Sequence, residues 1–105
     1  DNLTKLALEA EKYGAKAILL ECVTESAAKF ISSKVLIPTI GIGASKYCNG
    51  QILVFDDLIN LKLDSKKPKF VKNYLDFTKL SKIAVKKFNK DIKKRIFPNK
   101  NYSYS

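Results

Sequence analysis

An alternation of helical patterns with short, continuous apolar runs is the feature that most constrains the fold of this chain. Each run is too short for a helix and lacks a polar residue at every second position, so it indicates a strand buried on both faces. Helices that alternate with such strands are typical of parallel βα units. The sequence therefore predicts an α/β fold, with strands near residues 16–21, 37–41 and 51–55 and helices near residues 2–13, 24–34 and 74–96.

Three parallel strands with their helices would leave open sheet edges and uncovered apolar faces. A complete (βα)8 barrel needs about 200–250 residues, whereas this chain has 105. The chain does not begin with methionine and contains none. Residues 1–105 would supply less than half of such a TIM barrel, so we expect a partial domain of a longer protein or a subunit that another chain completes.

Charge and composition narrow the classes of partner. The formal net charge of +10 would suit nucleic-acid binding, but only Arg95 of the 20 basic residues is an arginine. Base and phosphate recognition favours arginine geometry, so we expect no nucleic-acid partner. No apolar run approaches the roughly 20 residues that cross a bilayer, so we expect no membrane segment. Cys22 and Cys48 have no histidine partner, which predicts reduced, mostly buried thiols in a cytoplasmic protein rather than a zinc site.

Glu21 is the strongest candidate for a catalytic residue. It directly follows the apolar run of residues 17–20, which places it at the carboxyl end of a predicted strand. Active sites of parallel α/β enzymes are built at that end, and a carboxylate there can act as a general base. Capping of the next helix, or pairing with a lysine, would explain Glu21 equally well, and its position alone does not separate these interpretations.

Two other groups of residues follow predicted strands. The glycines in residues 41–45 let the backbone approach a ligand closely, although a tight turn at a barrel rim is favoured over a phosphate cradle. Asp56 and Asp57 end the third predicted strand, on the same predicted face as Glu21. Paired carboxylates can hold Mg²⁺, but helix-capping or solvated aspartates are the favoured interpretation, so neither is assigned as a metal ligand.

Four separated motifs resemble the C-terminal portion of the ketopantoate hydroxymethyltransferase family. They are LECV at residues 20–23, IPTIGIGA at 37–44, GQILV at 50–54 and PKFVKNY at 68–74. Together they are specific, and the resemblance spans essentially the whole chain. It implies a (βα)8 barrel, represented here from the fifth helix through the sixth, seventh and eighth strands to the C-terminal helices.

The resemblance also implies an activity. Members of the family transfer a hydroxymethyl group from 5,10-methylenetetrahydrofolate to 3-methyl-2-oxobutanoate, giving 2-dehydropantoate for pantothenate and coenzyme A biosynthesis. The glutamate of the LECV motif, here Glu21, is implied as the proton acceptor. Mg²⁺ is implied to hold the keto acid through ligands in the N-terminal half, and the folate-binding residues stay unassigned. Further expectations are a large homo-oligomer, typically a decamer, and no activity for this segment alone.

Some residues depart from the family pattern. Thr24 stands where the family usually has proline, Ser45 replaces a glycine of a GIGAG loop, and Asn60 replaces a glycine. Asp56 stands in place of the histidine of a His-Asp pair, whose aspartate Asp57 matches. These departures keep open a second interpretation, a non-catalytic degenerate remnant or a basic binding module for acidic partners.

Overall fold

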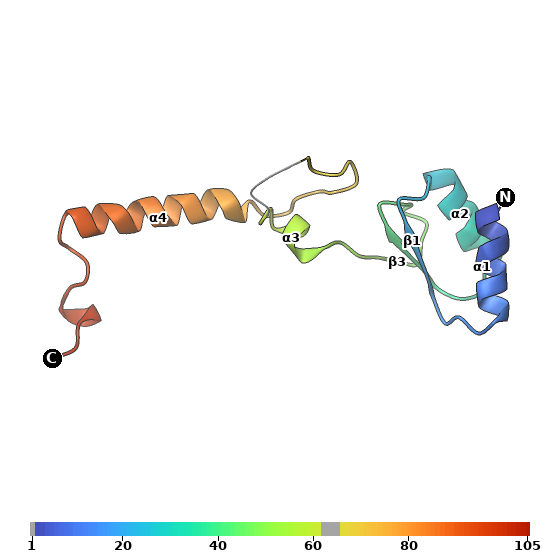
Figure 1. Ribbon diagram of the computed structural model, residues 1–105, viewed down its shortest axis with the longest axis horizontal. Coiled ribbons are helices and arrows are strands. Elements are labelled where there is room, and N and C mark those ends of the chain that lie inside the picture. Colours follow the sequence, from blue (N-terminus) through green and yellow to red (C-terminus); the bar gives the residue numbers. More distant parts are fainter. Residues whose placement is uncertain (1, 62–65) are drawn as a thin grey trace. The chain divides into compact units, whose positions relative to one another are not determined.

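The computed structural model describes residues 2–61 and 66–105, which form two compact units. The first unit contains residues 2–55 and 66–72, and the second contains residues 56–61 and 73–105. In chain order the elements are α1 (Asn2–Lys12), β1 (Ile18–Glu21), α2 (Glu25–Lys34), β2 (Thr39–Ile42), β3 (Gly50–Gln51), α3 (Phe55–Leu58), α4 (Phe77–Lys93) and the 3₁₀ helix η1 (Lys100–Tyr102) (Figure 1).

A small parallel sheet organises the first unit. Its strand order is β1-β2-β3, and both pairs of neighbouring strands are parallel. The register aligns Leu20 with Gly41 and Glu21 with Ile42, so the carboxyl ends of β1 and β2 lie together. The α/β class with parallel strands, which the apolar runs predicted, is confirmed.

Helices α1 and α2 cover one face of this sheet (Figure 1). Leu20 of β1 packs with Ala7 of α1 and with Ala28 and Ile31 of α2, and the last two are fully buried. These residues recur at helical spacing in their helices, so each helix presents one apolar stripe to the strands. The core of the first unit therefore lies between the sheet and the two helices, and Cys48 from the loop after β2 joins it.

The other face of β1 differs from the sequence prediction. Leu19 is 52% exposed and Glu21 is also exposed, whereas Leu20 between them is buried. Side chains alternate between the two faces of a strand, and in the described residues the helices cover only the Leu20 face. The prediction of a strand buried on both faces was therefore wrong for β1 within this chain. A short apolar run does not say how many of its faces are covered.

The third strand also differs from its predicted range of 51–55. β3 has only two residues, and their Cα partners in β2 are Ile40 and Gly41. β2 itself ends one residue later, at Ile42. The amide of Ile52 still donates to the Gly41 carbonyl at 3.0 Å, after which the chain turns into α3. Asp56 and Asp57 therefore lie in the first turn of a short helix rather than at a strand end, where carboxylates suit the helix dipole.

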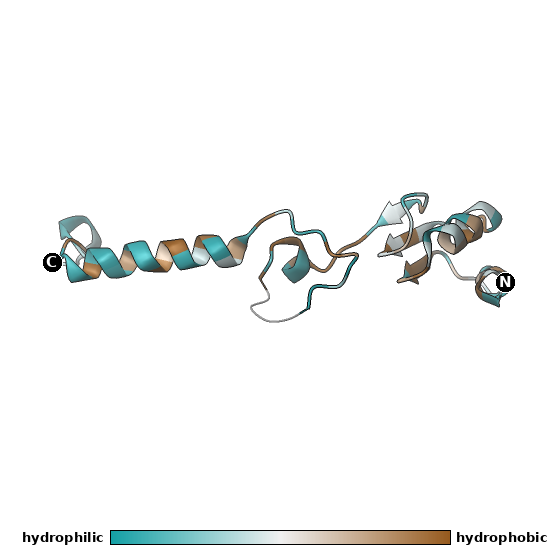
Figure 2. Ribbon diagram, turned by 90° about the horizontal axis from the view of Figure 1, so that it is seen from above, coloured by the Kyte–Doolittle hydropathy of each residue, from teal (hydrophilic) through white to brown (hydrophobic). Residues whose placement is uncertain are grey.

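Helix α4 dominates the second unit. Asp76 caps it by accepting a hydrogen bond from the amide of Lys79 at 3.1 Å, so the helix begins at Phe77 rather than near residue 74. Hydrophobic and hydrophilic residues alternate along it (Figure 2), and many of the hydrophilic ones are lysines. Within the described residues no α4 side chain is buried. Beyond the helix, Phe97 contacts Phe88 and Tyr102 with ring centroids 5.7 Å and 5.6 Å away.

Candidate active site

Glu21 is the last residue of β1. The next amide, of Cys22, donates to the Ile42 carbonyl at 3.0 Å, and Cys22 then turns the chain with a φ of +53°. Because neighbouring parallel residues share a face, Glu21 and Ile42 lie on the face opposite the one that α1 and α2 cover. The structure thus puts an exposed carboxylate at the carboxyl end of the sheet.

The loop after β2 is shaped by Gly43. Its φ of +62° lies in the left-handed region, which L side chains rarely adopt. A Cβ on Gly43 would also lie 2.7 Å from Cδ1 of Phe70, a residue from the turn far along the chain. Gly41, at the end of the same strand, is packed almost as closely, since a Cβ there would lie 2.9 Å from Oε1 of Gln51. Close packing therefore requires a glycine at position 43, whereas at position 41 the nearest atom belongs to the flexible end of the Gln51 side chain.

A cleft of about 890 Å³ opens at the carboxyl ends of β1 and β2. Its volume falls within the roughly 300–1,000 Å³ that is typical of small-molecule sites. Lys46 and Lys69 are its basic residues and Glu25 is its one acidic residue. The full lining is Cys22, Val23, Thr24, Glu25, Gly43, Ala44, Ser45, Lys46, Gln51, Lys69 and Phe70. Glu21 is not among the lining residues, but it directly precedes Cys22 at the cleft's edge.

A partly buried polar network surrounds Thr39, the first residue of β2. The hydroxyl groups of Thr39 and Ser32 share a hydrogen bond of 2.7 Å, and the Thr39 amide donates to Oδ1 of Asn49 at 2.9 Å. Ser32 also contacts the buried Cys48 sulfur at 3.8 Å. Thr39 has no exposed surface, so this network fixes the start of β2. The sequence pattern did not reveal it, because its members come from separate segments.

The two cysteines occupy different environments. Cys48 is buried in the core cluster, whereas Cys22 is exposed, and both are free thiols. The prediction of two mostly buried thiols was therefore wrong for Cys22. Its position explains the difference, because the left-handed turn at Cys22 carries the chain out of the sheet toward the cleft.

The aspartates that the sequence grouped with Glu21 do not join it in the first unit. Asp56 and Asp57 belong to the second unit, where the backbone carbonyl of Asp57 accepts a hydrogen bond from Nδ2 of Asn73. Across residues 2–61 and 66–105, no three histidine, cysteine, aspartate or glutamate side chains come together as a metal site. A Mg²⁺ ion needs several oxygen ligands, so the described residues do not fit one by themselves.

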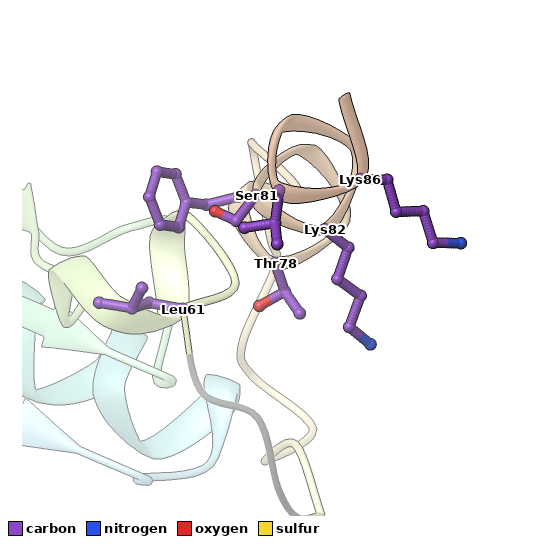
Figure 3. Close-up of a pocket in the computed structure, with 7 residues that line it drawn as sticks. Leu61, Thr78, Ser81, Lys82 and Lys86 are labelled. Carbon is purple, nitrogen blue, oxygen red and sulfur yellow. The ribbon is translucent and has the colours of Figure 1, made fainter. Parts of the chain in front are cut away.

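A second cavity, of about 460 Å³, lies in the second unit (Figure 3). Leu61 forms one side and the N-terminal half of α4 forms the other, with Lys82 and Lys86 extending away from Leu61. Its lining is Leu61, Phe77, Thr78, Ser81, Lys82, Val85 and Lys86. The lining contains no carboxylate, histidine or cysteine, so this cavity offers no general base and is a poorer candidate than the cleft.

No helix in the described part of the chain is both long and apolar enough to pass through a membrane.

Comparison with known proteins decides the family. The family model described as "Ketopantoate hydroxymethyltransferase" matches residues 1–100, nearly the whole chain. The chain belongs to this family. Two proteins named 3-methyl-2-oxobutanoate hydroxymethyltransferase are similar to it. The one from Thermosipho melanesiensis is 45% identical over 98% of this chain and 39% of its own length. The one from Helicobacter pylori is 47% identical over 98% of this chain and 38% of its own length.

A third relative with the same name, from Thermotoga maritima, is 43% identical over the entire chain. Here too the match covers only 38% of the relative's own length. The chain thus spans less than two fifths of these relatives of the ketopantoate hydroxymethyltransferase family.

Two departures from the ketopantoate hydroxymethyltransferase pattern are accommodated by local structure. Ser45 is buried, and its hydroxyl oxygen accepts a hydrogen bond from the Tyr47 amide at 3.2 Å. The Ser45 carbonyl accepts from Nε2 of Gln51 at 2.7 Å, which ties the loop to β3. Ser45 has no left-handed φ, so nothing in its backbone requires a glycine there.

Asn60 replaces a glycine at a position that does need a left-handed conformation. Its φ is +55°, and asparagine tolerates this region better than most residues. Its side-chain amide donates to Oδ1 of Asp76 at 2.9 Å. The hydrogen bond from the Lys79 amide, followed by the one from Asn60, holds the pKa of Asp76 below its ordinary value of 3.8. Asn60 therefore adds a hydrogen bond to the residue that caps α4.

Proposed function

We propose that this chain supplies the proton acceptor and one wall of the substrate cleft of a 3-methyl-2-oxobutanoate hydroxymethyltransferase. The observation that carries the proposal is the position of Glu21, at the carboxyl end of β1 and one residue before Cys22, which lines an 890 Å³ cleft. Family membership, from the match over residues 1–100, supports the reaction class. The name of the relatives, 3-methyl-2-oxobutanoate hydroxymethyltransferase, supports the choice of keto acid and of one-carbon transfer.

In the proposed reaction, a carboxylate oxygen of Glu21 removes the proton from C3 of 3-methyl-2-oxobutanoate. The electrons of the broken C–H bond pass into the C2–C3 bond, and the carbonyl oxygen becomes an enolate oxygen. Water releases the one-carbon unit of 5,10-methylenetetrahydrofolate as formaldehyde, with tetrahydrofolate as the leaving molecule. C3 then bonds to the formaldehyde carbon while the C2 ketone re-forms, the C–O π bond of formaldehyde breaks, and the resulting alkoxide takes up a proton to give 2-dehydropantoate. A positioned carboxylate typically contributes about 10²–10⁴-fold to such a proton transfer.

The open face of the sheet supports a larger assembly around Glu21. We propose that β1, β2 and β3 belong to a (βα)8 barrel whose other strands lie in the part of the relatives that this chain does not span. Those strands would cover Leu19 and shield Glu21 from water, which strengthens its interaction with a bound keto acid. We place the Mg²⁺ ligands in the same part, and we propose a cytoplasmic homo-oligomer such as a decamer.

A chimeric protein tests this function. Residues 1–105 would replace the matching segment of the Thermotoga maritima relative, which aligns with the whole chain. We expect the purified chimera to form 2-dehydropantoate from 3-methyl-2-oxobutanoate and 5,10-methylenetetrahydrofolate with Mg²⁺ present. Glu21→Gln should abolish product formation. The matched change Glu9→Gln, at an exposed position on α1 away from the cleft, should leave it intact.

A folded chimera that makes no product would instead support the non-catalytic interpretation. The 105-residue chain alone provides a further comparison. We expect no turnover from it, because its described residues do not form a metal site.

A further inference from the structure

We propose that Lys69 is a specificity-determining residue of the cleft, where its ammonium group binds a carboxylate of one of the two substrates. We further infer that Phe70 is a positioning residue, which fixes Lys69 at the cleft through its contact with Gly43. The inference rests on the proposed function, because that function supplies the two substrates. It assigns a role to a segment that proton transfer by Glu21 does not use.

The first step of the argument is the anchoring of the turn that carries Lys69. The Val71 amide donates to the Pro68 carbonyl at 3.0 Å, and the Val71 side chain is 4% exposed. Its neighbour Phe70 is partly buried and packs against Gly43. A Cβ added to Gly43 would lie 2.7 Å from ring atom Cδ1 of Phe70. Two consecutive apolar side chains thus hold this turn to the first unit, and Lys69 directly precedes them.

The second step is the charge of the cleft. Lys46 and Lys69 line it together with a single acidic residue, Glu25, so its formal side-chain charge is positive. The Lys46 ammonium group lies 5.3 Å from the centroid of the Tyr47 ring, where a cation–π contact already holds it. Within the described residues Lys69 makes no cation–π contact, and it is exposed at the cleft. It is therefore the better placed of the two cations to bind an anion.

The third step is the chemistry of the substrates. 3-Methyl-2-oxobutanoate carries one carboxylate next to its ketone, and the folate co-substrate carries carboxylates on its glutamate tail. A lysine ammonium group recognises either kind as a point charge with three donors. Lysine loses much side-chain freedom when it binds, so a backbone already fixed by Phe70 and Val71 lowers the total ordering cost. The shared ligand chemistry is thus a carboxylate, and experiment must identify its source.

The test has a binding arm and a kinetic arm. In the first, the 105-residue chain is titrated at low ionic strength with 3-methyl-2-oxobutanoate and, separately, with tetrahydrofolate, while the Gly43 amide is followed by NMR. We expect Lys69→Met to weaken the binding of one probe about tenfold, the loss typical of one charge-assisted hydrogen bond. Lys66→Met is the matched control, since Lys66 is exposed on the same segment and does not line the cleft.

In the kinetic arm, the chimera carrying Lys69→Met should show a KM raised about tenfold for the same substrate, with kcat unchanged. Phe70→Ala should raise that same KM with kcat unchanged, and the conservative change Phe70→Tyr should restore it. If Phe70 had a merely structural role, Phe70→Ala would lower kcat and raise KM for both substrates together, or it would lower stability alone.

The two arms separate this inference from the proposed function. If the chimera made no product, the binding arm would still report on Lys69 in the chain itself. If Lys69→Met and Lys66→Met had the same affinities and the same KM values for both substrates, the assignment of Lys69 would be overturned.

Discussion

Phe70 occupies the space that a side chain on Gly43 would need, and Gly43 is held there with a left-handed φ of +62°. This contact joins the loop after β2 to a turn 27 positions later in the sequence, so both line the same cleft. It also decides between two interpretations of the glycine-containing loop. The geometry is that of a tight turn packed against an aromatic ring, and the close approach is to Phe70 rather than to a phosphate.

Substitution of Gly43 should therefore be costly. For Gly43→Ala we expect a loss of about 2–4 kcal/mol in the free energy of unfolding, from left-handed strain and overpacking together. Urea unfolding of the 105-residue chain measures it. Gly14→Ala is the matched control, because Gly14 has a φ of +97° but nothing within 4 Å of the added Cβ. It should show only the strain, about 1–2 kcal/mol.

The steric part of this effect has its own test. In the double variant Gly43→Ala with Phe70→Ala, the ring is gone, so the two losses should be less than additive by about 1 kcal/mol or more. Phe70→Ala combined with Gly14→Ala should be additive. Strict additivity in the Gly43 pair would show that the ring does not limit this position.

Much of the framework was predictable from the sequence, because the pattern of apolar residues reports which side of an element is buried. Leu20, Ala28 and Ile31 lie in the core, as their spacing in a strand and a helix indicates. The pattern could not show that Leu19 is exposed, since that depends on what covers the second face. It also placed the aspartate pair at the end of a strand over residues 51–55, because this run looks equally apolar whether or not a neighbouring strand offers partners.

The site was predictable only in part. Glu21 could be located at a strand end from its neighbours in sequence alone. The cleft could not be foreseen, since Lys69 and Phe70 reach it through contacts distant in sequence. A signal did exist in the glycine at position 43, because a glycine at a strand end predicts a close approach. The sequence does not say which side chain makes that approach.

Glu11 anchors the chain before β2 and gives a second stability prediction. Its Oε1 accepts hydrogen bonds from the amides of Leu36 and Ile37, at 2.6 Å and 2.9 Å. Glu11→Ala leaves both donors without this acceptor, so we expect a loss of about 1–3 kcal/mol in the free energy of unfolding. Glu9→Ala, at an exposed position on the same helix, should change it by less than about 0.5 kcal/mol. Equal effects in urea unfolding would exclude the anchoring role of Glu11.

The cap of α4 should depend on pH. The pKa of Asp76 is lowered from 3.8, chiefly by the hydrogen bond from the Lys79 amide and then by that from Asn60. A carboxyl group whose pKa is lower in the folded state stabilises the fold above its unfolded-state pKa, and this contribution is lost as the pH falls through the folded-state pKa. We therefore expect the Lys79 amide resonance to titrate with a midpoint below 3.8. A midpoint at or above 3.8 would contradict the cap, and Asp76→Asn should remove the titration.

Asn60 should contribute to that cap by two separable means. Asn60→Gly keeps the left-handed backbone accessible but removes the donor to Asp76, so the pKa of Asp76 should rise toward its ordinary value. Asn60→Ala removes the donor and adds left-handed strain, which should cost about 1 kcal/mol more than the glycine variant in the free energy of unfolding. NMR titration and urea unfolding of both variants measure the two effects. Equal stability of the two variants would argue against the strained conformation at this position.

Proton abstraction by Glu21 is the central claim, and deuterium exchange at C3 of 3-methyl-2-oxobutanoate tests it most directly. The exchange is followed by NMR in D₂O with the chimera and Mg²⁺, without folate, so it reports the base separately from one-carbon transfer. We predict that the chimera catalyses exchange, that Glu9→Gln leaves the rate unchanged, and that Glu21→Gln lowers it by at least about 10²-fold. An undiminished exchange rate in a folded Glu21→Gln protein would contradict the account.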